Sequence, residues 1–529
     1  MSPELRHKAA STQDIHLKHM TNQQKSFEIK EGQEYDIIIV GGGTTGIAAA
    51  VSAAREGAKV CLIEYYGFLG GNATTGLPWM AFHNLVGQRV IGGVAYEFIE
   101  RLWEVGGASD FYMDPVCSST IAVNPHWWKI ISMQEVKKEN IDVKLHSLVV
   151  GVDVDDSGSD GRKRAKGIFM TNKGGFHHLK AKVIMDCTDS GDIARMSGAT
   201  MVKGRAGDQK TQVSSYTITL SGIDVEPLLN YFRENPDDIR PFPIDNIDAL
   251  LEQMAEAEIF IIGGLRKLIV KARADGLELS RGVVPGLIFP KTGEMTTVAS
   301  SVEGLDPTDP DSFTKAEQEG MKQTQQWIKF FREYVPGCEK IYLSGTPHQI
   351  GIRETYHMED AEYLLTGEDL KAGKQFEDVI SLGGYHVDIH APNNDGHNTE
   401  YVGPPTFQIP FRSMLPKTID GLLVAGRAFG ATHEAQAATR VIPLSMAQGQ
   451  GGGQAAALAV SSGKELRDID IKELHRQLLK QGQVLDHTGL PKHPRASMFK
   501  VANIDGHVSL HNNEALQMGK ESEKLPKNP

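Results

Sequence analysis

Cysteine is scarce in this sequence, and the few cysteines present are scattered. The four occur without a C-x-x-C pair or any spacing typical of a metal site, at Cys61, Cys117, Cys187 and Cys338. This usage predicts a reducing compartment, the cytoplasm, and neither a disulfide framework nor a bound metal. No apolar run approaches the roughly 20 residues that span a bilayer. The polar residues 1–34 also lack the apolar segment of a secretory signal, and we expect them to form a flexible extension.

An excess of positive charge is missing as well. The formal net charge is −12 over 529 residues, so the basic stripes that bind nucleic acid or a membrane surface are not expected. This balance disfavours a role in tRNA modification. The partner we expect is a small-molecule substrate, with a homo-oligomer or an electron-acceptor protein left open.

Glycine, by contrast, is abundant, and its first cluster forms a nucleotide-binding motif. A β-branched run at residues 36–40 leads into G-x-G-x-x-G and an alanine-rich helical stretch, with glycines at Gly41, Gly43 and Gly46 and with Thr45 between the last two. These glycines permit the tight turn, the approach of a pyrophosphate and close helix–strand packing. Glu64 ends the next apolar strand and can accept hydrogen bonds from a ribose diol, which disfavours NADP. The motif predicts an adenine dinucleotide.

Farther along the chain, short strands alternate with Gly, Asp and Asn turns. Residues 143–198 form such a pattern, which predicts a β-meander and not a second βαβ unit. An apolar strand at 183–185 leads into D-C-T-D-S-G-D, and a late strand, G-L-L-V-A-G, begins at Gly421. No second G-x-G-x-x-G is followed by a strand and an acid, which disfavours a separate NAD(P)H-binding domain.

Together these blocks resemble FAD-dependent oxidoreductases of the glutathione-reductase-like fold, relatives of the succinate dehydrogenase and fumarate reductase flavoproteins. The likeness covers about residues 35–465 and rests on the first glycine motif, G-G-N-A-T, G-I-R-E-T, S-L-G-G-Y-H-V-D-I-H-A-P, I-P-F-R-S-M-L-P-K and A-G-R-A-F-G-A-T-H-E-A-Q-A-A-T-R-V-I-P. It implies an α/β fold in which a Rossmann-like FAD-binding domain, with a parallel sheet and a β-meander, carries an inserted α+β substrate or cap domain. Beyond the first motif, it implies FAD contacts at Gly71, Asn72, Thr74, Asp192, Gly426, Arg427, Gln448 and Gly449.

The sequence departs from this family at two places. Residues 188–192 read T-D-S-G-D where many relatives have T-G-D, so the freedom of the first glycine is lost while the Asp192 carboxylate remains. Residues 426–443 do not reproduce the H-G-A-N-R-x-G-G block of fumarate-reductase-like proteins. The carry-over of their substrate-binding His and Arg residues is correspondingly loose.

The expected domain organisation follows from these blocks and from the change of pattern between them. Residues 246–276 and 314–335 show helical spacing around alternating strands at 283–306, which indicates the inserted domain. The expected divisions are 1–34, a flexible extension; 35–222 and 405–465, the two parts of the FAD-binding domain; 223–404, the substrate or cap domain; and 466–529, a C-terminal helical segment and tail.

Two candidate catalytic residues lie in the expected cap domain. Arg353, in G-I-R-E-T, can neutralise a substrate carboxylate, or it can form a structural bridge with Glu354 or a neighbouring acid. His386 and His390 are four apart and would face the same side of an extended segment. A substrate-facing His386, a hydrogen-bonded loop histidine and a metal pair lacking a third ligand all remain open.

The other two candidates lie in residues 426–443. Proline disfavours helix at the residue before it, so Pro443 predicts that a helix beginning near Thr432 ends by Val441 and that a new one starts there, ending near Gly463. In the first helix His433 and Arg440 share a face with Gln436. They are expected to contact substrate or flavin, unless Arg440 simply pairs with Glu434.

The helix after Pro443 is rich in glycine, which weakens an isolated helix and indicates that something large packs flat against its first turns. In flavoproteins of the resembled fold, such a helix points its N-terminus at the flavin, where its dipole stabilises the anionic reduced form. The expected function is FAD-dependent oxidation or reduction of a small polar organic substrate. A flavoenzyme without net redox change and a flavoprotein subunit of an electron-transfer complex are the alternatives.

Overall fold

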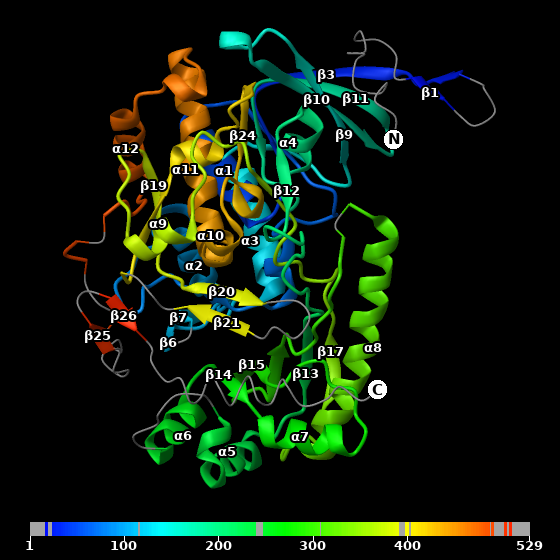
Figure 1. Cartoon of the computed structure of the whole chain (residues 1–529), viewed down its shortest axis with the longest axis vertical. Helices are drawn as coiled ribbons and strands as arrows, with labels where there is room; N and C mark the ends of the chain where they lie inside the picture. The colour runs from blue at the N-terminus through cyan, green and yellow to red at the C-terminus, as the bar shows by residue number, and fades with distance from the viewer. Residues whose placement is uncertain are drawn as a thin grey trace.

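The computed structural model has an upper part built on a large mixed sheet and a lower part built on a smaller one (Figure 1). The described residues are 16–18, 24–114, 117–239, 247–306, 308–390, 397–400, 404–486, 488–490, 493, 502–504 and 507–509. Most of the expected N-terminal extension and of the C-terminal tail lies outside them. Within the described ranges, no helix combines the length and apolarity needed to cross a membrane.

The large sheet has the order β23-β10-β11-β3-β4-β8, with β24 beside β11 and β9 beside β10. Its strands are β3 (Ile29–Val40), β4 (Val60–Ile63), β8 (Asp142–Lys144), β9 (Leu148–Asp155), β10 (Lys163–Asn172), β11 (Gly175–Asp186), β23 (Ile419–Asp420) and β24 (Leu422–Val424). The pairs β3–β4, β4–β8, β3–β11 and β11–β24 are parallel, whereas β9, β10 and β11 form an antiparallel meander. The predicted parallel sheet with a β-meander is confirmed.

Strand β3 is longer than the sequence pattern indicated. It begins at Ile29, inside the segment expected to be a flexible extension. Residues 29–34 are exposed in part, but their backbone pairs with the first half of β11, starting with Ile29 opposite Phe176. Because these residues are held by backbone pairing and not by buried side chains, their sequence carries no apolar pattern that would indicate a strand.

Helices and short sheets surround the large sheet. They are α1 (Thr44–Arg55), α2 (Gly93–Glu104), α3 (Pro125–Lys138), α4 (Asp192–Ser197), α9 (Gly367–Ala372), α10 (His433–Thr439), α11 (Ile442–Ser462) and α12 (Ile471–Lys480), with the 3₁₀ turns η2 (Gly71–Thr75), η6 (Gly426–Ala428) and η7 (Leu466–Asp468). The small sheets pair β5 (Trp79–Met80), β7 (Ser118–Ile121) and β6 (Tyr112–Asp114); β12 (Met201–Lys203) and β18 (Tyr356–Met358); β19 (Val379–Gly383) and β22 (Phe407–Pro410); and β20 (Val387–His390) and β21 (His397–Glu400). Isolated strand pairs lie nearer the termini: β1 (His16–Lys18) with β2 (Gln24–Ser26), and β25 (Ala502–Ile504) with β26 (His507–Ser509).

Helix α11 packs against α1 through its glycines (Figure 1). A Cβ on Gly449 would lie 2.2 Å from the carbonyl oxygen of Thr45, and one on Gly453 would lie 2.2 Å from that of Ala49. Gly451 is likewise closed in by Ile380. The glycines of α11 therefore allow it to pack closely against α1 and the core. This packing explains why the helix has so many glycines, without a contact to a cofactor.

The lower part is an antiparallel sheet of order β14-β15-β16-β13-β17 with helices around it (Figure 1). Its elements are β13 (Ile218–Ser221), α5 (Val225–Glu234), α6 (Ile247–Glu256), β14 (Phe260–Gly264), α7 (Arg266–Ala274), β15 (Val284–Phe289), β16 (Glu294–Thr297), α8 (Pro310–Tyr334) and β17 (Tyr342–Gly345). Its core is mostly drawn from residues 216–352, whereas residues 365–411 pack into the core of the upper part. The inserted domain is thus shorter than the expected 223–404.

The strand β14 corrects one sequence expectation. Residues 246–276 were expected to be helical, but only α6 and α7 are, and Phe260–Gly264 between them pairs with β15. Phe260 and the two isoleucines after it favour an extended conformation there. Residues 314–335, in contrast, form the expected helix, α8.

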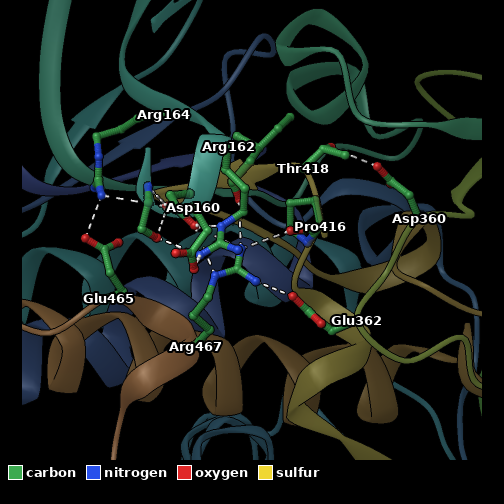
Figure 2. Close-up of polar contacts among 12 residues, drawn as sticks. Asp160, Arg162, Arg164, Asp360, Glu362, Pro416, Thr418, Glu465 and Arg467 are labelled. Carbon is green, nitrogen blue, oxygen red and sulfur yellow. Dashed lines mark hydrogen bonds and ion pairs between the residues drawn. The ribbon is translucent and has the colours of Figure 1, made fainter. Parts of the chain in front are cut away.

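A buried acid joins the C-terminal segment to the edge of the large sheet. The Asp420 side chain on β23 is only 1% exposed and accepts hydrogen bonds from Arg162 Nε at 2.9 Å and from Arg467 Nε, on η7, at 3.0 Å. Arg467 also binds Glu362, while Arg164 contacts Glu465 on the other side of the cluster (Figure 2). This network attaches η7 and the start of the C-terminal segment to β10 and β23.

Candidate functional site

The turn after β3 has the geometry that a dinucleotide pyrophosphate requires. Gly41 has φ +103°, and a Cβ there would lie 2.5 Å from the carbonyl oxygen of Cys187. A Cβ on Gly46 would lie 1.9 Å from the Gly41 carbonyl oxygen, so only glycine allows α1 to start this close to the strand. Gly43 differs, because its Cβ would meet no atom within 4 Å. It is the N-cap of α1 and makes no side-chain cap, which leaves the first amides of the helix available for an anion.

Glu64 lies beside this turn, after the last residue of β4. Its carboxylate accepts hydrogen bonds from the backbone N–H of Gly42 and of Tyr66, each at 2.7 Å. Burial raises the pKa of Glu64 above its usual range, although the two N–H donors oppose this shift. The donors fix the carboxylate at the end of β4, where a ribose hydroxyl can use the remaining lone pairs.

The turn η2 packs directly on the glycine turn. The Gly70 N–H donates to the Gly42 carbonyl at 2.8 Å, and a Cβ on Gly71 would lie 3.2 Å from the Cα of Gly43. Asn72 Oδ1 is buried there without a hydrogen-bond partner among the described residues. Thr74 uses its hydroxyl within the turn, donating to the Gly71 carbonyl at 2.7 Å.

The opposite wall is formed by the turns after β11 and β24. The departure from T-G-D at residues 188–192 is accommodated by Gly191, which has φ +62° and caps α4, so that Asp192 begins the helix. Burial raises the pKa of Asp192, and the charge of Asp189 adds to this effect. Arg427, on η6, pairs with Asp189 at 3.1 Å and donates to the carbonyl of Ile352.

The residues between these walls fit an FAD molecule. Gly426 has φ +78°, and a Cβ on it would lie 3.0 Å from Thr45 Oγ1, which brings η6 next to the first turn of α1. Gln448 on α11 is fully buried, and its Oε1, like Asn72 Oδ1, has no partner among the described residues. A bound FAD molecule could donate hydrogen bonds to these two buried acceptors, and its phosphates could occupy the open space at Gly43.

Helix α10 carries the polar face that the sequence predicted. Thr432 caps it, and the Thr432 hydroxyl accepts from the N–H of Ala435. The helix ends at Thr439. Helix α11 then begins at Ile442 and is capped at its C-terminal end by Gly463 in the left-handed conformation. The predicted boundaries around Pro443 are confirmed. His433 is buried, and its Nδ1 lies 2.6 Å from Glu354 Oε1.

Glu354 is the partner that sequence inspection did not assign to His433. Its other oxygen, Oε2, accepts from the backbone N–H of Gln212 at 2.8 Å, so both oxygens act as acceptors. Gln212 in turn donates through its side chain to Gln436 at 3.1 Å. Since Nδ1 of His433 is held by Glu354, Nε2 is the nitrogen left to exchange a proton.

Arg440 does not pair with Glu434, the partner that the sequence had left as an alternative. Its Nη2 lies 3.1 Å from Asp388 Oδ2 on β20 and donates to the Asp388 carbonyl at 3.0 Å. Glu434 is exposed on the other side of α10. The Glu434–Arg440 pair is therefore wrong, because residues six apart lie on different sides of a helix.

Arg353 likewise does not form the bridge to Glu354 that the sequence left open. Its Nη1 donates to the Val213 carbonyl at 2.7 Å and to Ser215 Oγ at 2.8 Å. Among the described residues, it contacts no carboxylate. Burial and the nearby charges of Arg281 and Arg440 hold the pKa of Arg353 well below its ordinary value.

Strand β20 brings further polar residues to the same place. His390 Nε2 lies 3.2 Å from Asp388 Oδ2, and Tyr385 donates its hydroxyl to the same oxygen at 3.1 Å. His386 is buried, with its ring centroid 4.2 Å from that of Tyr385. Among the described residues, no group of three or more His, Cys, Asp or Glu side chains is arranged to hold a metal ion. Strand β20 begins at Val387, so the extended segment predicted to carry both His386 and His390 includes only His390.

The fold and the glycine turn define a dinucleotide-binding flavoprotein. Residues 36–478 match the family model described as FAD dependent oxidoreductase, and the chain belongs to this family. FAD is therefore its cofactor, as the sequence resemblance implied. No curated protein gave a significant match to the sequence.

Several solved structures are distantly similar. A geranylgeranyl bacteriochlorophyll reductase-like protein from Thermoplasma acidophilum is 11% identical, with a TM-score of 0.43, 94% of this chain covered and 89% of that one. The p-nitrophenol 4-monooxygenase of Pseudomonas putida DLL-E4 is 10% identical, with a TM-score of 0.42 and coverages of 93% and 94%. A flavin-dependent brominase is 13% identical, with a TM-score of 0.40 and coverages of 84% and 83%. At this level of similarity, none of them identifies the reaction of this chain.

Proposed function

We propose that the protein is a dehydrogenase or reductase that transfers a hydride between the flavin N5 of FAD and a carbon of a small polar organic substrate. The observation that carries this proposal is the buried pair of His433, on the helix between η6 and α11, and Glu354, which precedes β18; their side chains are 2.6 Å apart. Hydride transfer to or from carbon is commonly coupled to a proton transfer, and such a pair can supply it. When bound, FAD supplies the two-electron chemistry.

In this proposal, the residues of the chain bind the cofactor and orient the substrate. Gly43 and the first amides of α1 hold the pyrophosphate, Glu64 holds a ribose, and Asn72 and Gln448 offer their buried oxygens to donors of the cofactor. Asp192 and Arg427 belong to the opposite wall, whereas Gly449 faces Thr45 of α1. Glu354 orients His433 so that Nε2 takes up or releases the proton.

The proposal also places Arg440, Arg353 and His386 around the substrate. Arg440 extends from the C-terminal end of α10 and donates to Asp388 on β20. Arg353 donates to the Val213 carbonyl, and the N–H of Val213 donates to His390 on the same strand. Gln436 of α10 donates to the Arg353 carbonyl at 2.9 Å and so ties Arg353 to this helix. Arginine and histidine at one end of a polar face are suited to positioning an anionic or polar group.

Anaerobic rapid mixing of the FAD-loaded protein with a panel of small hydroxy, amino and unsaturated acids tests this function. Both half-reactions are followed at the flavin absorbance, starting from oxidised protein and from photoreduced protein. We expect at least one compound to reduce or reoxidise the flavin. If product forms from a panel member while the flavin spectrum never changes, the redox function is wrong and a flavoenzyme without net redox change takes its place.

Variants then test the proton-transfer pair. General acid–base catalysis contributes about 10²- to 10⁴-fold, so His433→Gln should slow the responsive half-reaction by at least about 100-fold. Glu354→Gln should slow it as well, with FAD content unchanged. The matched control is His475→Gln on α12, outside the site. Equal rates in His433→Gln and His475→Gln would remove His433 from the mechanism.

A further inference from the structure

The segment that follows β17, at residues 346–355, contacts both walls of the FAD site. Its first half lies against the wall formed by η2 and the residues after β4. There the Tyr66 hydroxyl donates to the side chain of Gln349, and Thr74 Oγ1 lies 3.4 Å from His348 Nδ1. The segment thus begins beside residues that were assigned to the cofactor on other grounds.

The second half of the same segment lies against the opposite wall. The Ile352 carbonyl accepts a hydrogen bond from Arg427 on η6. Thr355 donates its hydroxyl to the carbonyl of Asp189, in the turn after β11, at 2.6 Å. Residues 348–355 therefore pass from one wall to the other, and side chains on this segment are placed to reach the cofactor between them.

His348 lies in an aromatic cluster at the start of this passage. Its ring is edge-on to the rings of Tyr66 and Phe68, with 5.0 Å between centroids in each case. Burial and the charge of Lys129, whose Nζ lies 4.4 Å from the Phe68 ring centroid, lower the pKa of His348 to about 4. The imidazole is therefore neutral at neutral pH.

The contacts of Thr74 assign the tautomer of this neutral ring. A neutral imidazole has one N–H donor and one acceptor nitrogen. The single hydroxyl hydrogen of Thr74 goes to the Gly71 carbonyl at 2.7 Å, so its oxygen accepts from His348 Nδ1. Nδ1 then carries the hydrogen and Nε2 carries the lone pair.

The acceptor nitrogen of His348 is left without a donor. Nε2 is buried and has no hydrogen-bond partner among the described residues. Leaving a buried acceptor unpaired is unfavourable, and such a group in a native structure indicates a ligand or solvent molecule that supplies the donor. Its place beside η2, in the segment that joins the two walls, favours the cofactor as that donor.

We propose that His348 is a cofactor-binding residue whose Nε2 accepts a hydrogen bond from a hydroxyl or amino group of FAD. FAD carries such donors on its ribityl chain, its ribose and its adenine. Since His348 follows the last strand of the inserted domain, that domain takes part in holding the cofactor. The inference does not depend on the hydride-transfer proposal, because it concerns the binding of FAD and not its reaction.

Titration of the apoprotein with FAD, followed by flavin fluorescence, tests the assignment without turnover. His348→Phe removes the acceptor but keeps a ring beside Tyr66 and Phe68, so the dissociation constant of FAD should rise about 5- to 100-fold, as expected when a buried donor loses its partner. His348→Gln carries an acceptor oxygen that can reach the place of Nε2, and it should restore most of the affinity. The matched control is His475→Phe on α12, which should bind FAD like the natural protein.

The variants separate the acceptor from the packing of the ring. Natural affinity in His348→Phe would overturn the assignment. Equal weakening in His348→Phe and His348→Gln would also overturn it, because the loss would then come from the shape of histidine. Urea unfolding of the apoproteins should give the same midpoint for His348→Phe as for the natural protein, which distinguishes a loss of cofactor binding from a loss of stability.

The ring nitrogens of the natural protein provide a second measurement, which decides even if His348→Phe does not fold. In nitrogen NMR spectra of the protein with isotope-labelled histidine, the signals of His348 are those missing from His348→Gln. We expect the tautomer with hydrogen on Nδ1 and, when FAD is added, a shift of the Nε2 signal to lower frequency, as acceptance of a hydrogen bond produces. Hydrogen on Nε2, or an Nε2 signal that FAD leaves unchanged, would overturn the proposal.

Discussion

Removing the negative charge of Asp420 should destabilise the protein strongly, although Asp420 lies away from the cofactor walls. Its carboxylate accepts from Arg162, Arg467 and both the N–H and the hydroxyl of Ser159, the last two at 2.7 Å. Asp420→Asn leaves the shape nearly unchanged but replaces an acceptor oxygen by a donor. Two guanidinium groups then face an amide instead of a charge (Figure 2 shows Arg162 and Arg467 converging).

The expected loss lies near the lower end of the range for a broken buried ion pair. Removing one partner of such a pair costs about 3–5 kcal/mol. The side chains of Arg162 and Arg467 are 18% and 15% exposed and keep their contacts with Asp160 and Glu362. Water and these acids compensate in part, so we expect a decrease of about 3 kcal/mol in the free energy of unfolding.

Urea unfolding of the FAD-loaded protein, followed by circular dichroism, measures this decrease. The control is Asp208→Asn, which removes an acid from an exposed pair with Arg205 and should change the unfolding midpoint little. If Asp420→Asn unfolds at the same urea concentration as the control, the network does not stabilise the fold and the reasoning is refuted.

The same carboxylate predicts a pH dependence. Burial alone would raise the pKa of Asp420, but the hydrogen bonds of Ser159 and the charges of Arg467 and Arg162 hold it below its ordinary value. The stabilisation is therefore complete above the unfolded-state pKa of about 3.9 and is lost as pH falls through the lower folded-state value. Between pH 5 and pH 3, the urea midpoint should fall more for the natural protein than for Asp420→Asn. Parallel curves would contradict this.

Three further substitutions test the FAD contacts and the packing of α11 on α1. Gly43→Ala places a methyl group in open space at φ −70°, so we expect an intact fold with reduced FAD content, measured by absorbance after gel filtration; normal FAD content would argue against a phosphate at this position. Gly449→Ala forces a methyl group onto the Thr45 carbonyl and should cost about 1–3 kcal/mol in urea, whereas Gly263→Ala, with free space around it, should cost little. Gln448→Met should melt like the natural protein without FAD but bind FAD more weakly, and equal affinity would show that Oε1 serves no cofactor donor.

The features that the sequence predicted well are those set by local chemistry. The glycine turn, Glu64 at the end of its strand and the helix boundaries around Pro443 each depend on residues adjacent in the chain. Glycine and proline restrict the backbone in the same way in any fold. The extent of the inserted domain was predicted less well, because residues 365–387, which were assigned to the cap domain, pack into the other core.

The contacts within the candidate site could not be predicted in this way. His433 and Arg440 were recognisable as polar residues on one helix face, but their partners, Glu354 and Asp388, come from segments far away in the sequence. Arg281, whose charge acts on Arg353, gave no sequence signal, because no motif surrounds it in the segment between α7 and β15. Long-range pairing of this kind depends on the tertiary packing of the chain, which no local pattern records.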